Sequence, residues 1–143
     1  ICRSPMAEMI FKHMLREKGL QHAFFAASAA TSTEEIGSRV HHGTAAILDR
    51  LGIDYSEKRA RQMTKKDYQD YDMLIGMDEW NMRNMSRIAG GDPEGKLHLL
   101  LDFTDRPGDV ADPWYTRNFE VTYRDVMDGC EGLLAYLEEN GMI

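Results

Sequence analysis

The sequence predicts a single α/β domain with a parallel sheet, and three observations support this fold class. Short apolar runs, typical of buried parallel strands, alternate with longer segments whose apolar residues recur at helical spacing. The chain has 143 residues, which is the size of one domain with a substantial core. No repeat, low-complexity tract or linker interrupts it. Alternating strands and helices favour parallel strands joined by right-handed crossovers.

The first part of the chain predicts a helix, a strand and a loop. Ser4 is a strong N-cap residue and Pro5 is favoured at the first helical position, so we expect Ser4 to cap a helix that begins at Pro5. Gly19 is a suitable stop for this helix. Its apolar residues at helical spacing are Met6, Met9, Ile10, Met14 and Leu15. The apolar run 23–27 is expected to form a buried strand, and the polar run 28–38 a loop.

The middle of the chain continues the alternation. A second helix is expected over about 44–51. Thr64, followed three residues later by Asp67, resembles a capping box with Asp in place of the usual Glu or Gln. The apolar run 73–77 predicts a second strand. Asp78 is then expected to cap a helix that continues to about residue 88.

The last third predicts a strand, a polar loop and a long helix. Leucines over 97–101 mark the strand, and the loop 104–118 follows it. The apolar stripe of the last helix consists of Phe119, Tyr123, Val126, Cys130, Leu133, Leu134 and Leu137. Gly141 ends this helix, and Cys130 is expected to be a core thiol.

Composition and charge limit the kinds of partner. The chain carries 17 basic and 24 acidic residues, a net charge of −7, without a basic cluster. This balance argues against nucleic acid or a membrane surface as the partner. No apolar run reaches the length of a bilayer span, and no signal peptide is visible. The two cysteines, Cys2 and Cys130, form no disulfide framework and indicate a reducing, cytoplasmic compartment.

The histidines do not predict a metal site. His41, His42 and His98 are the candidates by residue type. We expect the adjacent pair to point to different faces, and no second pair of ligands stands at a useful spacing. The sequence therefore predicts no metal.

The start of the first helix is a candidate anion-binding site. The free N–H groups and the positive dipole end of a helix attract anions. Arg3 stands beside them, always charged and able to bond two oxygens of a phosphate at once. We therefore expect a phosphate- or sulfate-type oxyanion here. On these residues alone, an ordinary helix start with a surface arginine remains the alternative.

An anion-binding turn in α/β folds normally joins a strand to a helix. The sequence has no strand before Arg3. We therefore expect the natural protein to have an upstream strand, with this sequence beginning inside the loop that follows it. Residues 1–143 are then a single domain that is truncated at its N-terminus.

Six segments resemble low-molecular-weight protein tyrosine phosphatases. The family's phosphate loop reads cysteine, five residues, arginine and then Ser or Thr, and Ile1–Glu8 is similar to its second half. The other matching segments are Ser28-Ala29-Ala30-Thr31-Ser32, Glu35-Ile36-Gly37, Ala60-Arg61-Gln62, Met77-Asp78-Glu79-Trp80-Asn81 and Asp112-Pro113-Trp114-Tyr115. They fall in the family's order and spacing, and the match to the family covers essentially the whole chain.

The resemblance implies a four-stranded parallel sheet flanked by helices in three layers, and a two-step mechanism without metal or cofactor. A cysteine thiolate attacks the phosphorus and forms a cysteinyl-phosphate. Five residues stand between that cysteine and the arginine, so counting back from Arg3 leads to a position before Ile1. Cys2 is therefore not the nucleophile. It resembles an adjacent second cysteine, which in some members can form a protective disulfide with the nucleophile.

The resemblance also assigns roles by position. Arg3 binds the phosphoryl group, and Asp112 is the general acid that protonates the leaving phenolate and then the base that activates water. The residues expected to contact the substrate are Ile1, Cys2, Ser4, Trp114 and Tyr115. The residues expected to support the loop from behind are Ser28 and Asp78. Lys58 stands where many members carry a histidine that ties the loop network together.

The implied partners are phosphotyrosine proteins or small aryl phosphates, with phosphate, sulfate or vanadate-type anions as inhibitors. A related branch acts on phosphoarginine, but it carries threonine at the place of Ile1, so Ile1 and the Trp114-Tyr115 pair favour the tyrosine branch. One alternative is an arsenate reductase of the same fold, which needs additional redox cysteines. The other is a non-catalytic phosphoryl-binding module.

Overall fold

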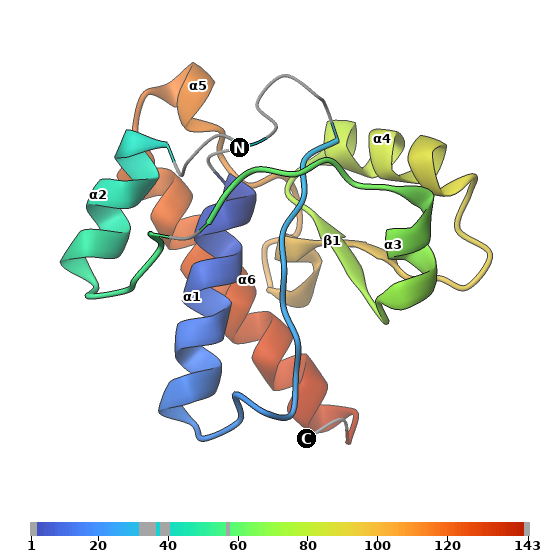
Figure 1. Cartoon of the computed structure of the whole chain (residues 1–143), viewed down its shortest axis with the longest axis horizontal. Helices are drawn as coiled ribbons and strands as arrows, with labels where there is room; N and C mark the ends of the chain where they lie inside the picture. The colour runs from blue at the N-terminus through green and yellow to red at the C-terminus, as the bar shows by residue number, and fades with distance from the viewer. Residues whose placement is uncertain (1–2, 32–36, 38–40, 57, 142–143) are drawn as a thin grey trace.

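The computed structural model describes residues 3–31, 37, 41–56 and 58–141 (Figure 1). In chain order the elements are α1 (Arg3–Glu17), α2 (His42–Arg50), α3 (Lys65–Asp70), β1 (Leu74–Gly76), α4 (Glu79–Ala89), β2 (Leu97–Leu99), the 3-10 turn η1 (Leu100–Phe103), α5 (Pro113–Thr116) and α6 (Phe119–Glu139). β1 and β2 pair in parallel, with Leu74 opposite Leu97 and Gly76 opposite Leu99. The α/β class is therefore confirmed, whereas the four-stranded sheet stays a prediction.

The elements form two groups on either side of an extended segment. α1, α2 and α6 pack together on one side, and β1 lies with α3 and α4 on the other (Figure 1). The segment 20–31 runs between the two groups as a long blue trace (Figure 1). None of the described helices is long and apolar enough to cross a membrane.

Each group has its own apolar cluster. The larger cluster joins α1, α2, η1 and α6, and its most deeply buried members include Met6, Ile10, Leu48, Leu100 and Val126. The smaller cluster consists of Met63, Tyr68, Leu74, Met85 and Ala89. α6 approaches η1 closely at Gly132, where an added Cβ would lie 2.8 Å from the carbonyl carbon of Phe103. Glycine is needed there because the clash is with backbone.

Several helix boundaries follow the local signals in the sequence. The Asp78 carboxylate accepts a hydrogen bond from Asn81 N–H at 2.7 Å, which confirms Asp78 as the N-cap of α4. The Asp67 carboxylate accepts from Thr64 N–H at 2.8 Å, as the capping box predicts. The prediction that Ser4 caps the first helix is wrong. α1 begins at Arg3, so Ser4 lies inside its first turn.

The strand predicted at 23–27 is also wrong, because this segment is extended but has no regular strand structure. Among the described residues, Ala23 N–H donates to Leu20 O at 2.9 Å, and the next bond between main-chain groups comes only beyond this segment, where Ala30 N–H donates to Arg61 O at 2.7 Å. The one parallel bridge nearby joins Ala30 to Gln62. An apolar run becomes a strand only where a neighbour supplies a ladder of hydrogen bonds.

The third predicted strand is shorter than expected. β2 ends at Leu99, and 100–103 turn into η1. The Asp102 carboxylate accepts from Leu99 N–H at 3.3 Å, and Thr104 N–H donates to Leu101 O at 3.1 Å, which closes the turn. The predicted loop 104–118 also contains the short helix α5.

Candidate active site

Arg3 lies in the first turn of α1, and its guanidinium is bound on two sides. Nη2 lies 2.8 Å from Oδ2 of Asp78 and 3.6 Å from Oδ2 of Asp112. Nη1 donates to the carbonyl oxygen of Val110 at 3.0 Å. The side chain is largely buried. The structure thus brings together three residues that the sequence analysis selected, from α1, the end of β1 and the loop before α5.

Asp78 connects the sheet to the arginine. One carboxylate oxygen caps α4 and the other pairs with Arg3. The side-chain oxygen of Asn81 accepts from Met77 N–H at 3.0 Å and so closes the turn between β1 and α4. Because Asp78 is fixed by its own helix cap, it holds the guanidinium in one orientation.

Asp112 stands at the N-terminus of α5. Its carbonyl oxygen accepts from Tyr115 N–H at 3.0 Å and from Thr116 N–H at 3.1 Å. Its half-buried carboxylate faces Arg3. Tyr115 is 82% exposed, so it stands in solvent on the same short helix. The predicted contacts of Ile1, Cys2 and the Trp114 side chain lie outside the described part of the structure.

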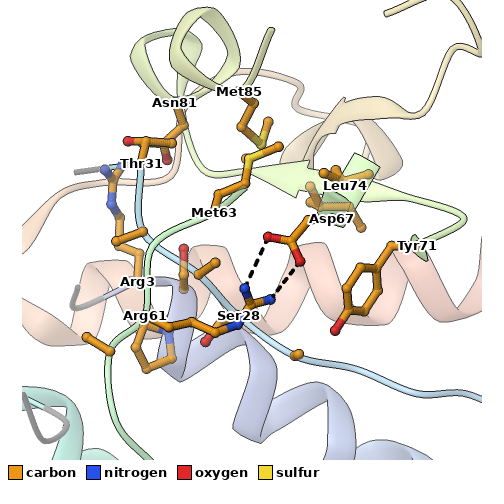
Figure 2. A pocket seen from close by; sticks show the side chains of 18 of the residues that line it. Arg3, Ser28, Thr31, Arg61, Met63, Asp67, Tyr71, Leu74, Asn81 and Met85 are labelled. Atoms are coloured by element: carbon orange, nitrogen blue, oxygen red, sulfur yellow. Dashed lines mark hydrogen bonds and ion pairs between the residues drawn. The ribbon is translucent and has the colours of Figure 1, made fainter. Parts of the chain in front are cut away.

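A cavity of about 220 Å³ opens beside Arg3 and Ser4. Its walls come from the start of α1, the segments 27–31 and 58–63, β1 and α4. Figure 2 shows the ion pair of Arg61 and Asp67 inside it, with N–O distances of 3.1 and 3.2 Å. The hydrogen bonds that Arg61 donates to the Asp67 carboxylate raise the pKa of Arg61. Burial alone would raise the pKa of Asp67, but bonds from Arg61 and Thr64 outweigh it and lower that pKa.

Glu8 is a buried carboxylate behind the site, and no pattern in the sequence marked it as a site residue. Its side chain is 4% exposed. Lys58 Nζ lies 2.6 Å from one oxygen, Ser28 Oγ donates to the same oxygen at 2.8 Å, and Lys12 Nζ donates to the other at 2.7 Å. Ser28 therefore supports α1 through Glu8. Burial acts to raise the pKa of Glu8, but the bonds from Lys12, Lys58 and Ser28 bring it below its ordinary value.

We expect Lys58→Met to lower the free energy of unfolding by about 1–3 kcal/mol at pH 7, because it leaves a buried carboxylate with one cation fewer. A carboxylate with a lowered pKa contributes stability above its ordinary value of 4.5, and this contribution is lost as the pH falls through the lower, folded-state value. The difference between Lys58→Met and wild type should therefore shrink in acid. Urea unfolding at several pH values measures it.

Lys12→Met is the matched control, because Lys12 binds the same carboxylate but is more exposed than Lys58. Its cost should be smaller, since an exposed ion pair contributes less. Equal costs for the two variants, or a Lys58→Met cost that does not depend on pH, would contradict this account of Glu8.

Cys130 lies in the core, as predicted. Its thiol is buried against α1 and donates weakly to Ala7 O at 3.7 Å. Burial raises the pKa of Cys130 to about 12. A buried thiol with a raised pKa is a poor nucleophile.

The two adjacent histidines lie differently from the prediction. The rings of His41 and His42 are in contact, with centroids 4.1 Å apart, and do not point to separate faces. The reason is that His41 precedes α2 and turns back to accept from Gly43 N–H at 3.2 Å. Among the residues that the structure describes, no group of three His, Cys, Asp or Glu side chains is arranged to hold a metal.

Comparisons with known proteins agree with this geometry. A family model described as "Low molecular weight phosphotyrosine protein phosphatase" matches residues 1–142. The low molecular weight protein-tyrosine-phosphatase YfkJ of Bacillus subtilis is 40% identical over 141 residues, which cover 97% of this chain and 90% of YfkJ. The crystal structure of YfkJ superposes with a TM-score of 0.94 at 39% identity, covering 98% of this chain and 89% of that one.

Two further crystal structures are similar. SP-PTP, the low molecular weight protein tyrosine phosphatase from Streptococcus pyogenes, has a TM-score of 0.84 at 38% identity, with 96% of this chain and 86% of that chain covered. The protein tyrosine phosphatase from Entamoeba histolytica, with Hepes in the active site, has a TM-score of 0.88 at 25% identity, with 99% and 92% covered. Fold and site thus define a phosphatase-type α/β protein. The chain belongs to the low molecular weight protein-tyrosine-phosphatase family.

Proposed function

We propose that this protein hydrolyses phosphotyrosine in proteins through a cysteinyl-phosphate, with Arg3 binding the phosphoryl group and Asp112 acting as general acid and base. The observation that carries the proposal is the meeting of these two side chains, 3.6 Å apart, at the N-terminal end of α1. A guanidinium and a helix N-terminus bind phosphoryl oxygens, and a carboxyl group beside them exchanges protons with the leaving group. The expected compartment is the cytoplasm.

In the first step a cysteine thiolate attacks the phosphorus while the bond to the phenolic oxygen breaks. The Asp112 carboxyl group gives its proton to that oxygen, and tyrosine leaves. Arg3 and the helix N–H groups hold the equatorial oxygens as their charge shifts in the transition state. In the second step the Asp112 carboxylate takes a proton from water, the water oxygen attacks the phosphorus, and the sulfur–phosphorus bond breaks. Phosphate and thiolate are released.

The nucleophile of this mechanism is a cysteine with five residues between it and Arg3. Counting back from Arg3, its position comes before Ile1. Ile1, Cys2 and Ser4 would then belong to the loop around the phosphoryl group, and Trp114 and Tyr115 would flank the phenol ring. Asp78 supports the loop arginine directly, at 2.8 Å, and Ser28 supports α1 through Glu8. Hepes in the active site of the Entamoeba histolytica relative supports oxyanion binding, because Hepes carries a sulfonate.

A four-stranded sheet in a single domain is part of this proposal. A cavity of about 1120 Å³ lies between the two groups of elements. Apolar side chains line it on both sides, among them Phe11 and Leu133 from the helices and Ile75 and Met77 at β1. A central parallel strand presents two apolar faces, so the strand expected upstream of Arg3 fits this space.

The test is turnover by the full natural protein. We expect release of phosphate from a phosphotyrosine peptide at a kcat/KM at least about 100-fold above that for matched phosphoserine and phosphoarginine peptides. Preference for the phosphoarginine peptide would assign the protein to the phosphoarginine branch. Tight phosphate binding without turnover of any peptide would support a binding module, and thiol-dependent reduction of arsenate would support the reductase.

A further inference from the structure

The loop that carries Asp112 is held from α6 by two buried side chains. We infer that Thr122 and Asp125 are positioning residues for the general acid, an inference that rests on the proposed function. Thr122 Oγ1 donates to Ala111 O at 2.7 Å, and Asp125 Oδ2 accepts from Ala111 N–H at 2.9 Å. Both polar main-chain groups of the residue before Asp112 are therefore bound by one helix.

The neighbouring residue on the other side is bound as well. Val110 N–H donates to Met77 O at 2.7 Å, and Val110 O accepts from Arg3 Nη1 at 3.0 Å. Residues 110 and 111 are thus fixed on two sides. Met77, just after β1, and Arg3 hold Val110, and α6 holds Ala111. The direction in which Asp112 leaves this segment, and its distance from Arg3, follow from those bonds.

Asp125 is itself oriented by an arginine. Arg106 Nη1 donates to Oδ1 of Asp125 at 2.8 Å, which leaves Oδ2 for Ala111 N–H. Arg106 Nη2 binds the exposed Asp128 at 2.6 Å. Asp125 and Asp128 therefore share one arginine, but of the two only Asp125 bonds to Ala111. This difference provides a control within the same ion-pair group.

These contacts have a direct consequence for proton transfer. A general acid must lie within hydrogen-bond reach of the leaving oxygen, and a displacement of about 1 Å costs up to 100-fold in rate. If Ala111 loses its bonds to α6, the peptide that leads into Asp112 is free to rotate. The expected defect is therefore specific to leaving groups that need a proton.

Thr122→Val removes the hydroxyl and keeps the shape of the side chain. We expect it to lower kcat/KM for phosphotyrosine about tenfold and to leave kcat/KM for dinitrophenyl phosphate within about twofold of wild type. Thr122→Ser, which restores the hydroxyl, should recover most of the loss. Asp125→Asn should show the same selective defect, and Asp128→Asn should show none.

Thermal unfolding of each variant separates this role from a structural one, because a loss of folded protein lowers the measured activity toward both substrates equally. An equal loss for both substrates, no loss in Thr122→Val, or a selective loss in Asp128→Asn would overturn the inference. Asp112→Ala is assayed alongside. If Asp112→Ala also shows no dependence on the leaving group, the general-acid role of Asp112 in the proposed function fails. If Asp112→Ala shows it and Thr122→Val does not, the positioning role alone fails.

Discussion

Replacing Arg3 by lysine is expected to lower kcat/KM for a phosphotyrosine peptide by about 10²- to 10³-fold, the effect of removing a preorganised donor from a developing oxyanion. Lysine keeps the positive charge beside Asp78 and Asp112. It lacks the planar fork that bonds two phosphoryl oxygens at once, and it cannot also hold Val110 O. Steady-state kinetics measure the fall in kcat/KM. The inhibition constant of inorganic phosphate should rise, because phosphate binds more weakly.

Arg16→Lys is the matched control for this prediction. Arg16 lies in the last turn of the same helix and is exposed, so the same exchange there should leave kcat/KM unchanged. A nearly wild-type Arg3→Lys enzyme would mean that Arg3 supplies only a charge. A loss of catalysis with unchanged phosphate inhibition would mean that the phosphoryl group binds elsewhere.

Asp112→Ala is expected to discriminate between leaving groups. For phosphotyrosine, whose leaving phenol has a pKa of about 10, kcat/KM should fall by about 10²- to 10⁴-fold because departure requires a proton. For dinitrophenyl phosphate the phenolate leaves without a proton, so the change should stay within about threefold. A plot of log kcat/KM against leaving-group pKa should be much steeper for the variant than for wild type.

Asp105→Asn is the control for Asp112, because it removes an exposed carboxylate from the same loop. Its plot should overlay that of wild type. Equal losses across all leaving groups in Asp112→Ala would remove Asp112 as the general acid and leave it only an electrostatic or structural part. Of the two residues, only Arg3 would then keep its proposed catalytic role.

The fold was predictable where the signal is local. The long stripe of α6 and the caps at Asp78 and Thr64 are encoded within a few residues, and the structure has them as expected. The lack of a strand at 23–27 was not predictable from composition, because strand formation depends on a neighbour that supplies a ladder of hydrogen bonds. The same apolar run remains extended without one.

The site was predictable only in part. Arg3, Asp78 and Asp112 were selected from motif order, and the structure brings them together. Glu8 was missed because an acidic residue near the start of a helix is usually only a dipole partner. Thr122 was missed because the apolar pattern of a helix does not show that a threonine hydroxyl on it bonds to the loop before α5. A signal that could have found Glu8 is its spacing of four residues from Lys12 on a helix that buries it.

The most direct measurement traps the covalent intermediate in the full natural protein carrying Asp112→Ala, with dinitrophenyl phosphate as substrate. Phosphorylation of the enzyme needs no acid with this substrate, but hydrolysis of the phosphoenzyme needs the base, so the intermediate should accumulate. After a denaturing quench, peptide mapping should find about one phosphoryl group per protein on the cysteine that five residues separate from Arg3, and none on Cys2 or Cys130. Turnover without a phosphocysteine, or a phosphoryl group on any other residue, would contradict the account.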